Sequence, residues 1–200
     1  QIGTAPGTIS VNLWNANTET SLKRIFNYSY FENLIPDTIV FSDINKLTTG
    51  VGVTLDDNGY EWYKITGNLD TVGNIDFGSR KIILFIESGN FNINGKINLD
   101  DNSGFFVAIV NGNITVAPTV TGSPSIEGMY VADTGFSTGL GTTQLHVRGS
   151  VASYGNITLQ RDLPDDTVIP AELFEFAPDQ VVLFPQKLMF RRFRWAEVAP

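Results

Sequence analysis

Apolar residues recur along this chain at two spacings, one of two residues and one of about 22 residues. From residue 60 onward, short β-branched and aromatic runs alternate with Gly-Asn, Asp-Asn-Ser-Gly and Thr-Gly breaks. Such runs and breaks are typical of strands and turns. The longer spacing is set by the apolar residue that follows each break, namely Leu69, Phe91, Ile114, Phe136 and Ile157.

A second register has the same period. The strand-like runs 60–65, 82–86, 105–110, 128–132 and 150–154 advance by 22 or 23 residues each time. Two registers with one period predict an all-β, right-handed parallel β-helix of about five coils, with the handedness taken from the coil size and from a family resemblance that residues 60–200 carry. Asparagines at equivalent turns are expected to form hydrogen-bonded ladders.

The period also predicts which side chains face inward and which face outward. His146 is expected on an exposed or half-exposed strand position, because Leu145 and Val147 face the other way. A stripe of aromatic side chains would bind glycans if it faces outward: Trp62, Tyr63, Tyr130 and Tyr154. The predicted inward column comprises Ile83, Phe85, Phe106, Ala108, Val131 and Val151.

Three regions follow from the pattern. Residues 1–59 form an N-terminal cap, with a strand at 8–14 and a helix at 18–35 that Pro36 ends. Residues 60–160 form the solenoid. Residues 161–200 form an extended C-terminal wrap, favoured by Pro164, Pro170, Pro178 and Pro185, with a helical turn at 171–176.

Composition narrows the function classes. The net charge of −8 argues against nucleic-acid binding. The chain has no cysteine, which excludes disulfides and thiolate chemistry. It also has no apolar run of the roughly 20 residues that a membrane span needs. Low charge and abundant Asn and Thr favour an extracellular location.

Candidate chemistry is sparse. The Gly-Asn repeats lack the spacing of a phosphate loop, and the acids of the middle coils do not converge as a glycosidase requires, so we expect a non-enzymatic protein without a cofactor. Calcium is a weak alternative at Asp100, Asp101 and Asn102, because that turn resembles the start of an oxygen-ligand loop. Three N-glycosylation sequons begin at Asn27, Asn113 and Asn156.

Two segments are candidates for an interface. The first is the strand 8–14, with Ile9, Val11, Leu13 and Trp14. The second is a basic aromatic tail that follows an acidic stretch. It is predicted to clamp onto its own solenoid or, alternatively, to meet the acidic surface of another copy. The tail comprises Lys187, Phe190, Arg191, Arg192, Phe193, Arg194 and Trp195.

Residues 60–200, above all "GNITLQRDL", "PAE" and the closing W-x-E-V-x-P, resemble the C-terminal module of large predicted cell-surface proteins of uncultured bacteria. The resemblance implies an extracellular β-helical module with an architectural or adhesive role and carries no catalytic residues. We therefore expect a structural module of a cell-surface protein that contacts itself or other domains and assembles by head-to-tail or strand-donation contacts. A glycan-binding module and a polysaccharide-acting enzyme are the alternatives.

Overall fold

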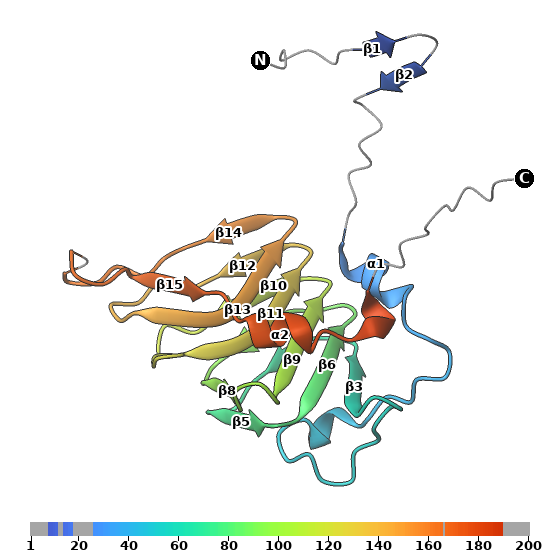
Figure 1. Cartoon of the computed structure of the whole chain (residues 1–200). Helices are drawn as coiled ribbons and strands as arrows, with labels where there is room; N and C mark the ends of the chain where they lie inside the picture. The colour runs from blue at the N-terminus through green and yellow to red at the C-terminus, as the bar shows by residue number, and fades with distance from the viewer. Residues whose placement is uncertain (1–7, 12–13, 18–25, 166, 190–200) are drawn as a thin grey trace, which may run out of the picture.

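The chain winds into a parallel β-solenoid (Figure 1). The computed structural model describes residues 8–11, 14–17, 26–165 and 167–189. One sheet has five strands, in spatial order β14 (Asn156–Thr158), β12 (Gly135–Ser137), β10 (Asn113–Val116), β7 (Phe91–Ile93) and β4 (Leu69–Asp70).

The second sheet has eight strands. Six of them follow one path, and the other two pair beside it. In spatial order the path is β15 (Glu172–Glu175), β13 (Leu145–Ser153), β11 (Ile126–Ala132), β9 (Phe105–Val110), β6 (Lys81–Ile86) and β3 (Tyr60–Ile65). The two strands beside it are β5 (Ile75–Gly78) and β8 (Ile97–Leu99), which pair with each other, and β8 also pairs with β11.

The strand registers confirm the period of about 22 residues. Leu69 pairs with Phe91, Phe91 with Ile114, Ile114 with Phe136, and Phe136 with Ile157. These five residues are the ones that define the longer spacing in the sequence. Four turns therefore join five levels of parallel strands, and the predicted all-β solenoid is confirmed.

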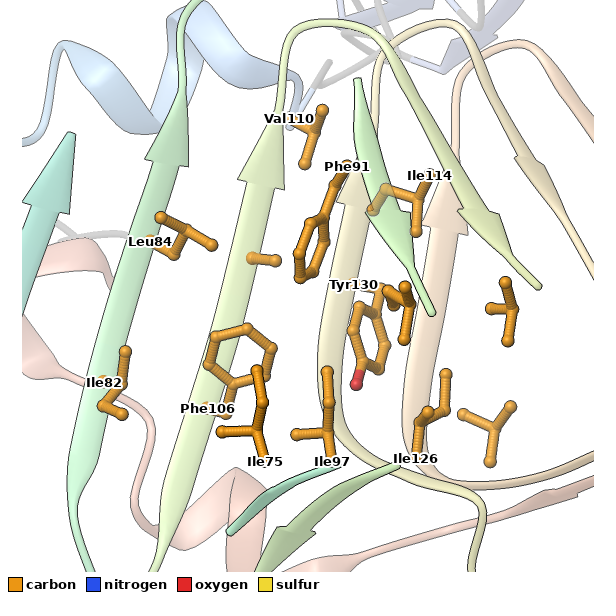
Figure 2. Packing of buried hydrophobic residues seen from close by; sticks show 14 of the residues in the cluster. Ile75, Ile82, Leu84, Phe91, Ile97, Phe106, Val110, Ile114, Ile126 and Tyr130 are labelled. Atoms are coloured by element: carbon orange, nitrogen blue, oxygen red, sulfur yellow. The ribbon is translucent and has the colours of Figure 1, made fainter. Parts of the chain in front are cut away.

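Large apolar side chains fill the space between the two sheets (Figure 2). Phe106 lies at 5.0 Å from Phe77 and 5.9 Å from Tyr130 between ring centroids, so aromatic rings contact one another between levels. The predicted asparagine ladder is also present, because Asn68 Oδ1 accepts from the backbone N–H of Asn90 and Asn90 Oδ1 accepts from that of Asn113. Each level is thus bonded to the next through both its core and its turns.

The outer face of the eight-stranded sheet is buried as well. It is covered by α1 (Tyr28–Glu32), α2 (Pro178–Val182) and η3 (Gln186–Leu188). Ile83, Phe85 and Val131 pack in this outer cluster, so their predicted inward orientation is wrong. Phe106, Ala108 and Val151 belong to the interior as predicted. In "IILFI" every residue is buried, so no polar alternation distinguishes the two faces.

The outward aromatic stripe is wrong too. Trp62, Tyr63 and Tyr130 are fully buried, and only Tyr154 is exposed. Tyr63 and Tyr130 face the interior, whereas Trp62 lies under the helices that cover the outer face. The glycan-binding alternative therefore loses the surface on which it was based.

The flanking segments differ from their predictions in detail. The helix expected at 18–35 is limited to α1 within the described residues, and Asn27 caps it by accepting from Tyr30 N–H; residues 18–25 lie outside them. The strand expected at 8–14 is an antiparallel pair, β1 (Thr8–Val11) and β2 (Trp14–Asn17). The helical turn expected at 171–176 is instead the strand β15.

No helix in the described part of the chain is long and apolar enough to cross a membrane.

Candidate functional site: the open end of the solenoid

The two ends of the solenoid are finished differently. At the β3 end, the loop 42–56 covers the first level. Ser42 N–H donates to the Trp62 carbonyl at 2.7 Å, and Asp56 N–H donates to the Tyr60 carbonyl at 2.9 Å. Leu47, next to the short helix η2 (Ile44–Lys46), is buried in the interior cluster. The backbone edge and the core of this end are therefore both partly closed.

At the other end, residues that continue the core are exposed to solvent. Ile157 continues the column of Phe136 but is 49% exposed, and Phe174 continues that of Val147 but is 43% exposed. Leu159, just after β14, is 54% exposed. We call β14 and β15, with Ile157, Leu159 and Phe174, the open end. It lies opposite β3 along the solenoid (Figure 1).

The open end also carries unpaired backbone. Among the strands that the structure describes, β14 pairs only with β12, and β15 pairs only with residues 145–148 of β13. Within the described residues, no strand lies beyond β14 or beyond the second half of β13. Such an edge is a template for the addition of another strand, because its outward N–H and C=O groups have no ladder partner.

Acidic side chains surround the open end. Asp162, Asp165 and Glu175 are exposed there. Arg161 is buried, and its guanidinium donates to the backbone carbonyls of Ala117, Pro118 and Thr138. Arg148 lies 4.0 Å from Glu175 and faces neither of the other two carboxylates. The surface charge of the open end is therefore negative.

His146 holds β15 and the loop 121–125 against β13. Its Nδ1 lies 3.0 Å from the Ser123 hydroxyl, and its Nε2 lies 2.8 Å from the Glu175 carboxylate. The predicted exposure of His146 is wrong: the side chain faces outward as expected, but these partners cover it and leave the residue 5% exposed.

The order hydroxyl, imidazole and carboxylate is also that of nucleophilic hydrolases. Such an enzyme additionally needs convergent N–H donors for an oxyanion. Among the described residues, His146 Nδ1 is the only hydrogen-bond partner of the Ser123 hydroxyl. We interpret the three side chains as a structural tie between segments.

Arg148 is a second tie beside the open end. Its guanidinium lies 2.9 Å from Asp179 and 3.2 Å from Glu127, and Asp101 is 3.5 Å away. Burial raises the pKa of Glu127, although Leu99 N–H and Arg148 act in the opposite direction. Burial also opposes ionisation of Asp179, but Asn102 N–H and Arg148 outweigh it and lower its pKa. Arg148 thereby fastens α2 to the sheet.

These contacts bear on the calcium candidates Asp100, Asp101 and Asn102. Asp101 faces Arg148, and Asn102 donates its backbone N–H to Asp179. In the described ranges, no group of three or more His, Cys, Asp or Glu side chains could hold a metal ion. The geometry of this turn therefore gives the calcium hypothesis no support.

The second interface candidate begins as an intramolecular latch. Lys187 Nζ lies 2.9 Å from Asp56 Oδ2, which also accepts from the Trp62 indole N–H. Burial would raise the pKa of Asp56, but hydrogen bonds from Tyr60 N–H, Lys187 and Trp62 lower it overall. Leu188 is buried in the same outer cluster as Trp62. The chain is therefore anchored at the β3 end up to Leu188.

The remaining candidates are only partly within the described residues. Ile9 and Val11 lie on β1 and Trp14 on β2, with Val11 opposite Trp14. Leu13 and the tail residues Phe190, Arg191, Arg192, Phe193, Arg194 and Trp195 lie outside them. Of the three sequons, the one at Asn156 is exposed, on β14, whereas Asn27 and Asn113 are half-buried.

The open end itself was missed in the sequence, although one signal for it existed. Ile157 is the last member of the 22-residue column, and no later residue continues that column.

Comparison with protein families, with curated proteins and with solved structures gives no match. A function can therefore be inferred only from the sequence and the geometry of this chain.

Proposed function

We propose that this chain is a non-enzymatic structural module of an extracellular surface protein and that it self-associates through the open end. One observation carries the proposal: the apolar column that the three inner levels bury at Phe91, Ile114 and Phe136 is half exposed at Ile157. A solenoid end that is left unpaired and apolar is an association surface, because each level depends on a neighbour to bury its core.

The free energy of burying the exposed side chains shows what kind of contact the open end needs. Complete burial of one large apolar side chain contributes about 1.5–3 kcal/mol, so three half-exposed side chains contribute roughly 2–5 kcal/mol. Micromolar affinity requires about 8 kcal/mol, and association has its own entropic cost. Contact between apolar tips is therefore insufficient. A strand that also pairs with the backbone edge of β14 makes up the difference.

The proposed location has weaker support. The low content of charged residues, the abundance of Asn and Thr and the resemblance of residues 60–200 to bacterial cell-surface modules all favour an extracellular protein. An architectural role needs no convergent acids or metal ligands. It does need an end that can be joined to another polypeptide.

A substitution at the centre of the open end tests the proposal. Ile157→Lys places a charge where an added strand would bury its side chain, whereas Val72→Lys, on a residue that is 91% exposed, is the matched control. Light scattering after size exclusion should show concentration-dependent oligomers for the wild type and Val72→Lys and monomers for Ile157→Lys. Assembly of Ile157→Lys at wild-type concentrations, or a wild type that stays monomeric at high concentration, would overturn the proposal.

A further inference from the structure

We propose that the strand added at the open end is the basic aromatic tail, residues 190–195, of a second copy of this chain. The inference rests on the proposed function, since it names the partner that the open end would bind. The charge of the tail is complementary to that of the open end, and the exit point and length of the tail exclude the open end of its own copy.

Charge and side-chain type are complementary. The tail "FRRFRW" has three arginines and three aromatic residues. In an extended conformation Phe193 and Trp195 share one face with Arg191. Arg192 and Arg194 share the other face with Phe190, because successive side chains of a strand alternate. The aromatic face matches Ile157 and Leu159. The arginines match the exposed carboxylates Asp162, Asp165 and Glu175.

The exit point of the tail is at the opposite end of the molecule. Lys187 is paired with Asp56, and Leu188 is buried in the same outer cluster as Trp62. The chain therefore reaches residue 189 near the closed β3 end, while the acceptor edge is β14 (Figure 1).

The tail is too short to pair with the open end of its own copy. β4 and β14 are the two edges of the five-stranded sheet, and a strand added to β14 lies one step further. At about 4.8 Å per step this is roughly 24 Å from the first level. From residue 189 to 192 an extended chain covers only about 10 Å. The tail can therefore pair with β14 only in another copy.

A donor at one end and an acceptor at the other make the contact heterologous. Each copy that accepts a tail still presents its own tail at its far end, so the assembly grows without closing. The expected product is an unbranched filament. Strand addition through the main chain is the same mode that joins donated strands in other assemblies.

Deletion of the tail separates this inference from the proposed function. A chain ending at residue 189 should stay monomeric and should bind a fluorescent peptide of residues 189–200, whereas Ile157→Lys should bind the peptide at least tenfold more weakly. If the truncated chain assembles like the wild type while Ile157→Lys does not, the open end is an association surface but the tail is not its partner. If both assemble, the proposed function fails as well.

Charge exchange tests the contact itself. Arg192→Glu with Arg194→Glu should raise the concentration for half-assembly about tenfold, and Lys96→Glu, at a charged residue of the solenoid body, should leave it unchanged. A mixture of this double variant with Asp162→Arg/Asp165→Arg should again form filaments by electron microscopy, because the tail of each variant then meets an open end of opposite charge. Absence of a change in the double variant, or equal loss with Lys96→Glu, would overturn the inference.

Discussion

Close approach between levels fixes certain residues as glycine. A Cβ on Gly95 would lie 1.9 Å from the carbonyl oxygen of Gly73, one turn earlier, so no larger residue fits without moving the backbone. Gly73 itself has open space around it but a φ of 72°, which non-glycine residues rarely adopt. The two glycines thus occupy the same corner of successive levels for different physical reasons.

These reasons predict different costs. Gly73→Ala should lower the free energy of unfolding by about 1 kcal/mol, the cost of a left-handed alanine. Gly95→Ala should lower it by about 3 kcal/mol, because the levels must separate locally. Urea denaturation followed by circular dichroism measures both. Equal losses would show that the levels can shift freely at this corner.

The hydrogen bonds of the Gln180 side chain allow a second prediction about the free energy of unfolding. It is buried, its amide Nε2 donates to the Gly104 carbonyl at 2.8 Å, and its Oε1 accepts from Phe106 N–H. Gln180→Leu leaves two buried backbone groups without partners and should cost about 2 kcal/mol in urea denaturation. Gln186→Leu, on an exposed position of the same segment, should change stability by less than about 0.5 kcal/mol. A similar cost for both variants would contradict this account.

Residue-level prediction from sequence succeeded where the polar pattern was informative and failed where tertiary cover decided. Phe91 and Ile114 were correctly assigned to equivalent positions of successive turns, because polar residues bracket them. The inward orientation predicted for Ile83 and Phe85 was wrong, since both faces of β6 are buried. The burial of His146 depends on Glu175 and Ser123, which are 29 and 23 residues away in the chain.

At the scale of elements, α2 and η3 form a strap that two carboxylates hold in place. Asp179 joins α2 to Arg148, and Asp56 joins η3 to the loop under β3. The pKa of each carboxyl is lower in the folded chain than its ordinary value of 3.8. Their stabilisation is therefore complete above about pH 4 and is lost as the pH falls through the lowered values.

We expect the strap to be released in acid before the solenoid unfolds. Protonation of Asp56 and Asp179 removes its ion pairs, whereas Glu127, whose pKa is raised, is more easily protonated in place and opposes this loss. Pepsin should cut within residues 178–189 as the pH falls below about 4, while circular dichroism still reports the sheet. Asp56→Asn should shift the onset of cleavage to higher pH. Simultaneous loss of strap and sheet would contradict separate stabilities.

Elements in the repeat were predictable, and those outside it were not. The period defined β7, β10 and β12 because each level repeats the same turn chemistry. β15 was mistaken for a helical turn, since "ELFE" has no neighbour in the repeat and becomes a strand only by pairing with β13. The open end required the same pairing information.

At the scale of the molecule, two electrostatic effects on assembly have opposite signs. Each copy has a net charge of −8, so copies repel one another at long range, and salt weakens this repulsion. The proposed contact joins arginines to carboxylates at short range, and salt weakens this attraction. Loss of the tail removes three arginines and one glutamate, so the truncated chain has a net charge of −10.

The sign of the salt dependence therefore reports which contact forms the assembly. Raising NaCl from 0.1 to 1 M shortens the screening length from about 10 to about 3 Å. If the tail joins the copies, the concentration for half-assembly should rise several-fold over this range, as followed by light scattering. If apolar contact alone joined the open ends, assembly would instead strengthen with salt. The only electrostatic effect would then be the long-range repulsion between copies, which salt weakens. A fall in that concentration with salt would thus contradict the tail as partner while leaving the open end as the surface of association.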